Sequence, residues 1–496
     1  MKVSRLLLGV VLAFWSGSLL AVCIVNQQPG QGTKPERDWI ARTFANLSDC
    51  PSTLEEFVDI IKDDSLITTA TMVANRGYHN PRFGSFSLFE SVSGFSQSLD
   101  VELKPEHFMF GHFTGAAQGV VRLDQAPRRG KLLIELILWD FKKELYNFYE
   151  LIGNGRGADW FYRGDSEDAF RDNAELHLSA NPAFGKRMRC SGCHTTGGPI
   201  MKELQGPHND WWTSERPLVF SPNVLSEKVA NKVEDLADAK HLAKAVENGI
   251  NLLESSEPFQ KFKETLSLPE QLRPLFCLTE INLISDSNPI DQVAASTISS
   301  EYFINPLLYP KTSISFSKTL YKELSADLWV FPETNRSNPD HAWLAPVKSY
   351  ADQKSIETLV NKGMFDEEFV LDVLAIDFQN PAHSKIRCDL LQMVPLAPDS
   401  NWQQKFVANL TVSQNEGAIQ LLSHLQDPNK DSDFHKMQAG KHLEKVRVDM
   451  NSQDLLIQYM QKLQSDRNAV FESVISKNPL GQILEPGFRV VFPVSR

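Results

Sequence analysis

The chain has 496 residues, of which 42% are hydrophobic, and this is more than one compact core usually holds. Two or three domains are therefore expected. The 62 acidic residues outnumber the 50 lysines and arginines, and the net charge of −12 without a basic run argues against nucleic acid or an anionic membrane surface as the main partner.

The N-terminus has the pattern of a secretory signal. Lys2 and Arg5 supply positive charge, and residues 6–20 are almost wholly apolar. This run is short for a transmembrane helix, so residues 1–22 are predicted to be a signal peptide. An uncleaved anchor helix is the alternative at this end.

The residues that close this segment allow two kinds of processing. Ala21 suits the general signal peptidase, whereas residues 19–23 approximate a lipoprotein box in which Val22 is a poor residue before the cysteine. We expect a periplasmic protein. An outer-membrane lipoprotein is the alternative, and membrane association is expected only if Cys23 is lipidated.

Predicted secondary structure changes in character along the chain. The first part mixes amphipathic helices with apolar, alternating strands, and helical spacing dominates beyond residue 165. The fold class expected is α+β, mostly α. The predicted regions are a mixed α+β region (23–165), a helical region (166–310) and a helical C-terminal region (311–496). The helices expected are 36–47, 53–62, 165–177, 223–237, 241–255, 269–276, 353–362, 366–376, 415–425 and 433–463, and the strands are 83–89, 131–139 and 145–151.

One motif carries chemistry, the run Cys190-Ser-Gly-Cys193-His194. Two thiols at this spacing match the two vinyl groups of haem, and the histidine that follows supplies the proximal iron ligand. Covalent attachment of haem takes place outside the cytoplasm, in agreement with the predicted signal peptide. The sequence therefore predicts one haem c, held by Cys190, Cys193 and His194, and the helical region 166–310 is expected to be a cytochrome c-like haem-binding region.

Two other uses of a Cys-x-x-Cys pair fit less well. A thioredoxin-like motif belongs near a βαβ pattern, and this one lies among Arg, Thr and a Gly-Gly-Pro run. A structural zinc site needs a second ligand pair, but the next cysteine, Cys277, has no partner beside it.

Residues around the motif can be interpreted as parts of a haem pocket. The loop at Gly197-Gly198-Pro199 would bring the Pro199 carbonyl to the second imidazole nitrogen of His194 and orient the ring. Basic residues would pair with the haem propionates, and the alternative for them is a solvated surface patch. Aromatic residues would line the macrocycle, and the alternative for them is ordinary core packing. These residues are Lys186, Arg187 and Arg189, and Trp160, Phe161, Trp211 and Trp212.

The distal ligand is left open by the motif. Met201 is the first candidate for the distal ligand. It lies seven residues after His194, and seven extended residues span roughly 24 Å, barely enough to round a porphyrin edge and return to the iron. His208 is the next candidate. A vacant sixth position and more distant residues are further alternatives, among them His107, Met109, His112 and His177.

The four cysteines outside the motif are even in number, as expected for disulfides in an oxidising compartment. Their order along the chain favours Cys23–Cys50 and Cys277–Cys388, although four cysteines allow three pairings. Lipidation of Cys23 would leave Cys50 without this partner, and buried thiols are the alternative for Cys277 and Cys388.

The stretch RCSGCHTTGGPIMKEL, residues 189–204, resembles bacterial proteins that carry a cytochrome c domain with a single haem c site. The pieces YNFYEL (146–151), DWFYRGD (159–165) and RPLFC (273–277) are also similar to that group. The resemblance implies haem c binding and electron transfer, carried over for Cys190, Cys193 and His194 only, and it implies no substrate. Dihaem cytochrome c peroxidases carry two such motifs and this chain has one, which argues against a two-haem peroxidase mechanism.

Three functions remain open on the sequence. The first is an exported monohaem protein that transfers electrons to or from a redox partner protein. The second is a haem-dependent peroxidase or oxygenase with an open distal site, for which Arg76, His107, His112 and Arg163 are available polar groups. The third is an outer-membrane-associated scaffold or haem sensor. Whether the chain is an enzyme is left open, and a low-spin or high-spin haem distinguishes the first two.

Overall fold

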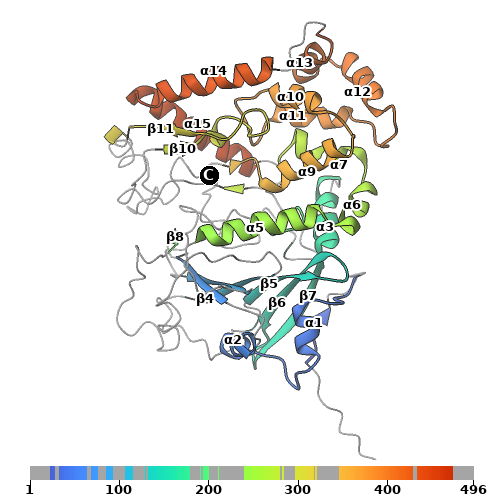
Figure 1. Ribbon diagram of the computed structural model, residues 1–496, viewed down its shortest axis with the longest axis vertical. Coiled ribbons are helices and arrows are strands. Elements are labelled where there is room, and N and C mark those ends of the chain that lie inside the picture. The colour runs from blue at the N-terminus through green and yellow to red at the C-terminus, as the bar shows by residue number, and fades with distance from the viewer. Residues whose placement is uncertain are drawn as a thin grey trace, which may run out of the picture.

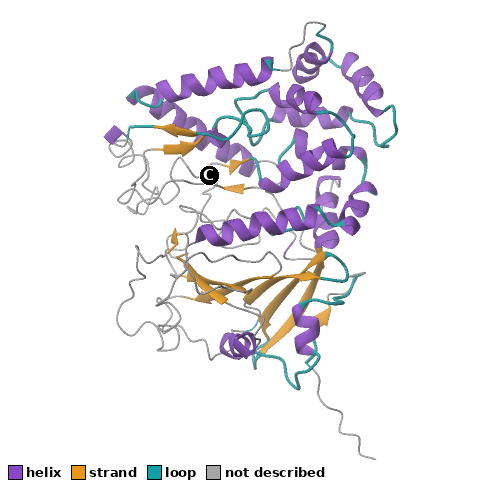
Figure 2. Cartoon of the chain, viewed as in Figure 1, coloured by secondary structure: helices purple, strands orange, loops and turns teal. Residues whose placement is uncertain are grey.

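The structure is a computed structural model of the whole chain. It describes residues 23–27, 33–63, 69–75, 85–92, 107–114, 129, 132–178, 190, 194–199, 210–211, 239–279, 282–283, 297–317, 319–320, 346–427 and 433–472. The predicted signal peptide and the predicted helix at 223–237 lie outside these residues. The fold is α+β and mostly α, as predicted, with the large sheet and the majority of the helices in different parts of the molecule (Figure 2).

The described strands of the N-terminal half form an eight-stranded sheet with the order β1-β7-β6-β5-β4-β3-β2-β8. The short β1 pairs parallel with β7, and the other pairings in this sheet are antiparallel. The strands are β1 (Asn26–Gln27), β2 (Thr69–Asn75), β3 (Ser85–Val92), β4 (His107–Thr114), β5 (Leu132–Asp140), β6 (Leu145–Gly153), β7 (Ala158–Asp165) and β8 (Asp210–Trp211).

The two faces of this sheet are covered by different helices (Figure 1). Helices α1 (Trp39–Phe44) and α2 (Leu54–Asp63) cover one face, where Trp160 packs against Phe44 and Phe57. On the opposite face Trp139, Tyr146 and Phe148 pack with α5 (Ala239–Glu254). Side chains alternate along β6, so Tyr146 and Phe148 share one face and Tyr149 takes the other.

A buried carboxylate fastens the segment before α1 to the turn between β5 and β6. Asp140 accepts backbone N–H groups from Glu36 and Arg37 and from Lys142 and Lys143, at 2.7–3.1 Å. Burial alone would raise the pKa of Asp140, but these four donors outweigh it and lower the pKa. The charged carboxylate therefore holds two segments that lie about a hundred residues apart in the sequence.

A second acid, Asp38, lies beside this contact. Its side chain caps α1 through the Ala41 N–H at 2.7 Å and accepts hydrogen bonds from the Asn147 amide and the Tyr149 hydroxyl. Burial raises the pKa of Asp38 and the three donors oppose that shift. The sheet and α1 are thus joined by polar as well as apolar contacts.

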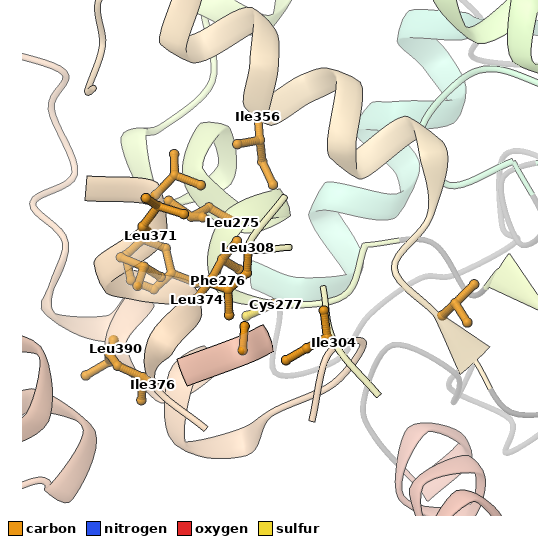
Figure 3. Close-up of a cluster of buried hydrophobic side chains, with 14 of the residues drawn as sticks. Leu275, Phe276, Cys277, Ile304, Leu308, Ile356, Leu371, Leu374, Ile376 and Leu390 are labelled. Carbon is orange, nitrogen blue, oxygen red and sulfur yellow. The ribbon is translucent and has the colours of Figure 1, made fainter. Parts of the chain in front are cut away.

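The C-terminal half is helical and has its own extensive apolar core. Figure 3 shows part of it, with Cys277 among leucine, isoleucine and phenylalanine side chains. Helix α9 packs on both α5 and α7, so it connects the sheet region to this core. The helices are α3 (Ser166–Leu178), α5, α6 (Glu257–Glu264), α7 (Leu268–Phe276), α9 (Tyr350–Asn361), α10 (Glu367–Ala375), α11 (Lys385–Asp389), α12 (Trp402–Thr411), α13 (Glu416–Leu425), α14 (Phe434–Asp449) and α15 (Gln453–Glu472), with 3₁₀ turns η4 (Ser300–Tyr302) and η5 (Leu390–Met393). Short strands β9 (Asn282–Leu283) and β12 (Pro346–Val347), and β10 (Thr297–Ser299) and β11 (Ser313–Ser315), form two antiparallel pairs.

The longest predicted helix is two helices in the structure. The helix predicted at 433–463 is divided at residues 450–452 into α14 and α15. The Asn451 and Ser452 N–H groups bond back to the end of α14, and the Ser452 carbonyl accepts the Leu456 N–H to start α15. The 3.6-residue spacing continues through this corner, and for that reason the pattern alone predicts a single helix.

Both predicted disulfides are present. Cys23 bonds to Cys50 across 27 residues, and Cys277 bonds to Cys388 across 111 residues. The first ties the strand β1 segment to the loop after α1, and the second joins the end of α7 to α11. Among the described helices, none has the length and apolar character needed to cross a bilayer.

Candidate cofactor site around Cys190 and His194

The predicted attachment motif is described at both of its ends. Cys190 is buried and His194 is half-buried. The His194 N–H donates to the Cys190 carbonyl at 2.8 Å, so the two residues lie one helical turn apart. Cys193 and Met201 lie outside the described residues, and their roles stay predictions.

The imidazole of His194 is held by its own loop. Its Nδ1 lies 2.8 Å from the Gly198 carbonyl oxygen. The carbonyl can only accept, so the ring proton is on Nδ1 and the lone pair is on Nε2. The prediction of the Pro199 carbonyl as the acceptor is wrong by one residue, because the Gly197 N–H bonds to the His194 carbonyl and closes a tight turn before Gly198.

Gly197 makes this turn possible in two ways. Its φ is +79°, a left-handed conformation that favours glycine. A Cβ here would lie 2.5 Å from the backbone oxygen of Ser166, at the start of α3. The loop that carries His194 therefore lies directly against the α3 backbone, and only glycine fits.

Apolar side chains of the sheet and of α5 form the wall of the site. The Phe148 ring lies 5.1 Å from the His194 ring, centroid to centroid. Cys190 belongs to the buried cluster that includes Phe148, Tyr146 and Trp139, and Leu253 of α5 lies close against Gly198. Cys190 and His194 thus lie between the sheet and α5.

The loop is also fastened to the helical half. Thr195 Oγ1 donates to the Thr279 carbonyl at 2.9 Å, two residues beyond Cys277 of the second disulfide. The Thr279 N–H and hydroxyl both bond to Asp352, which forms a buried ion pair with Lys348 at 2.9 Å. Burial lowers the pKa of Lys348 and raises that of Asp352, and the contact between them opposes both shifts.

Two residues expected near the haem lie elsewhere or have another partner. Trp160 is on the opposite face of the sheet from Phe148 and donates its indole N–H to the Pro51 carbonyl. Arg163 pairs with the buried Glu150 at 2.6 Å and lies over the Phe161 ring. Both residues lie on strand β7. The sequence does not predict this strand, so it does not show which face of the sheet each side chain takes.

Apart from Phe161, which lies on β7 beneath Arg163, the other predicted pocket residues are not placed. The side chains of His107, Met109 and His112 on β4, of His177 on α3 and of Trp211 on β8 are not described. Outside the described residues altogether lie Arg76, Lys186, Arg187, Arg189, His208 and Trp212.

The described residues fit a covalently attached haem. An imidazole whose Nδ1–H is bonded to a carbonyl presents Nε2 as the metal ligand, an arrangement typical of histidines that bind metals. A buried cysteine one turn before it and an apolar wall of aromatic and aliphatic residues complete the set. The chain therefore offers the donor and the surroundings that a proximal haem ligand needs.

A further group of polar side chains was missed by the sequence analysis. Asp372, His424 and His435 meet among the C-terminal helices. They are 52 and 11 residues apart, so no local spacing could reveal them.

Comparison with known proteins finds no matching protein-family model, no matching curated protein and no matching solved structure. The function of this chain is therefore inferred from the chemistry of the site.

Proposed function

We propose that the chain is an exported c-type cytochrome with one haem, bonded through Cys190 and Cys193 and ligated by His194, and that it transfers electrons with a redox partner protein. The observation that carries the proposal is the 2.8 Å contact between His194 Nδ1 and the Gly198 carbonyl. It fixes the tautomer that ligates iron through Nε2, inside the one Cys-x-x-Cys-His motif of the chain.

A bound haem would supply one-electron redox chemistry at its iron. The chain's contribution is to orient the ligand and to set its surroundings. The Gly198 carbonyl polarises the Nδ1–H bond and makes Nε2 a stronger donor, which favours the oxidised metal. Phe148 and the cluster around Cys190 exclude water from this side of the site and lower its dielectric constant.

The disulfides support the proposed compartment. Such bonds persist in the periplasm and are rare in the cytosol. Cys23 Sγ is bonded to Cys50, and a sulfur in a disulfide cannot also carry a lipid thioether. This pairing favours a periplasmic protein over an outer-membrane lipoprotein.

The proposal is tested by producing the chain with a haem c maturation system and staining a denaturing gel for haem. We expect one covalent haem per chain, and no retained stain in the Cys190→Ala, Cys193→Ala double variant. The matched control is the Cys277→Ala, Cys388→Ala double variant, which removes two cysteines outside the motif and should keep its haem. Absence of covalent haem from the parent chain, or its retention without the motif cysteines, would refute haem c attachment.

Absorption spectra then separate electron transfer from catalysis at an open site. Electron transfer predicts a six-coordinate, low-spin haem in both oxidation states and a reduced protein that does not bind carbon monoxide. A high-spin ferric spectrum with rapid binding of carbon monoxide would refute the electron-transfer proposal and favour the peroxidase or oxygenase alternative. A Met201→Ala variant, compared with the Met393→Ala variant in η5, tests the predicted distal ligand.

A further inference from the structure

Three helices of the C-terminal half bring together two imidazoles and a carboxylate. Asp372 comes from α10, His424 from the last turn of α13 and His435 from the first turn of α14. One potential ligand atom from each lies within 4.8 Å of the other two. Tetrahedral zinc holds its ligand atoms about 3.3–3.5 Å apart at bond lengths of about 2.0–2.1 Å, so small side-chain movements suffice to close around an ion.

The hydrogen bonds already orient the two rings. His435 Nε2 lies 3.1 Å from Asp372 Oδ1, so the two atoms that would share an ion are neighbours. His424 Nδ1 lies 3.3 Å from the backbone carbonyl of Asp372. That contact leaves Nε2 of His424 as the ligand atom, the same arrangement of carbonyl and imidazole that positions metal-binding histidines in other proteins.

The carboxylate of Asp372 is fully buried, so its immediate neighbours determine whether its charge is compensated. Asp372 is 0% exposed and His435 is 8% exposed, whereas His424 is half-buried and lies at the edge of the cluster. A buried carboxylate is costly unless it is paired, and the neighbour that pairs with Asp372 here is His435 Nε2 at 3.1 Å. A divalent ion between these two atoms would compensate the carboxylate and use the same geometry.

We propose that Asp372, His424 and His435 form a second metal site, specific for a divalent first-row transition ion of the zinc class and separate from the haem motif. Two imidazoles with one carboxylate are a donor set that zinc uses, and three protein ligands leave a position for water. Hard ions such as calcium and magnesium prefer six or more oxygen ligands, which this cluster does not offer. The ion would join α10, α13 and α14 and would stabilise their packing.

The test is a calorimetric titration of the purified, haem-loaded full-length protein with Zn²⁺ after treatment with a chelator. We expect one saturable zinc site per chain and a thermal unfolding midpoint that rises with zinc concentration. The His424→Gln and His435→Gln variants should bind zinc at least about 10-fold more weakly, since even the loss of an outer-shell partner has an effect of this size. Their midpoints should not rise with zinc.

The control is the His442→Gln variant. His442 lies on α14, is also partly buried and packs against Phe378, but it is not one of the three residues. Its zinc affinity should equal that of the parent. Because His424 is half-buried, its variant should retain the parent's circular dichroism spectrum, so weak binding there cannot be assigned to unfolding. The proposal is overturned if the parent shows no stoichiometric zinc site, or if the His424→Gln variant binds zinc as tightly as the His442→Gln variant.

Discussion

Replacing Gly197 with alanine tests whether the close approach of the His194 loop to α3 holds the cofactor site. An alanine here would adopt a φ of +79° and place its Cβ 2.5 Å from the Ser166 oxygen. The left-handed backbone costs about 1–2 kcal/mol for a residue with a Cβ. Restoring ordinary contact, which begins at 3.4 Å, requires a shift of about 0.9 Å between two backbone segments, and overpacking of this kind costs about 1–3 kcal/mol more.

Gly363 supplies a matched control. Its φ is +69° and a Cβ there would meet nothing within 4 Å. The Gly363→Ala variant should therefore lose only the backbone contribution of about 1–2 kcal/mol. Both alanines also reduce the entropy of the unfolded chain by a similar amount, so that effect cancels between the two variants.

The assay is denaturant unfolding of the haem-loaded protein, followed by haem absorbance and by circular dichroism. Gly197→Ala should lose about 1–3 kcal/mol more than Gly363→Ala, and only Gly197→Ala should alter the haem spectrum, because it displaces the carbonyl that orients His194. Equal losses of stability and an unchanged haem spectrum would show that the close approach does not constrain the site.

Three further predictions concern the frame around the site. Removing the Cys277–Cys388 disulfide, which closes a loop of 111 residues, should lower the free energy of unfolding by about 4–5 kcal/mol. Removing the Cys23–Cys50 disulfide, which closes 27 residues, should lower it by about 3–4 kcal/mol, and denaturant unfolding of the two double-alanine variants measures both losses. In Asp140→Asn an NH₂ group replaces one of the two oxygens that accept backbone N–H groups. The free energy of unfolding should therefore fall by about 2–3 kcal/mol in the same assay. Burial lowers the pKa of His383, so the unfolded chain binds its proton more tightly; stability should fall as the pH drops below about 6.5, and His383→Gln should lessen that fall.

Each of these has a contrary outcome. Equal losses for the two disulfide variants would contradict the loop-length argument. An Asp140→Asn variant as stable as the parent would mean that water replaces the lost acceptor. A parallel loss of stability in the parent and the His383→Gln variant between pH 7 and pH 5 would show that His383 does not cause the fall.

The local pattern of apolar and aromatic residues was sufficient to predict much of the fold. The apolar spacing of α5, α9 and α13 and the aromatic density of β5 and β6 were sufficient to predict those elements within a few residues. The disulfide pairing was also predicted, because order along the chain happens to match proximity in space. The strand β7 was missed, since DWFYRGD has polar residues within its aromatic run.

Features that depend on contacts between distant segments could not be predicted from the sequence. The acceptor for His194 was misplaced by one residue because Gly197 closes a tight turn on the His194 carbonyl. Gly197 lies directly against the backbone of Ser166, 31 residues earlier in the chain, and the sequence does not show this contact. Trp160 was expected near the haem, although the sheet register places it on the far face. Asp372, His424 and His435 come from three separate helices, and only packing brings them together. The haem itself stays a prediction from the motif, supported by the loop geometry.

The long disulfide has a consequence for how the chain matures. A chain exported from its N-terminus, as the proposed function entails, presents Cys23 and Cys50 early, and they can be oxidised at once. The motif cysteines and Cys277 emerge next, while Cys388 is still 111 residues behind its partner. If the chain is exported and carries haem as proposed, oxidants and the haem-attachment machinery would compete for the same thiols during that interval. Correct maturation would then depend on the relative rates of export, oxidation and haem ligation.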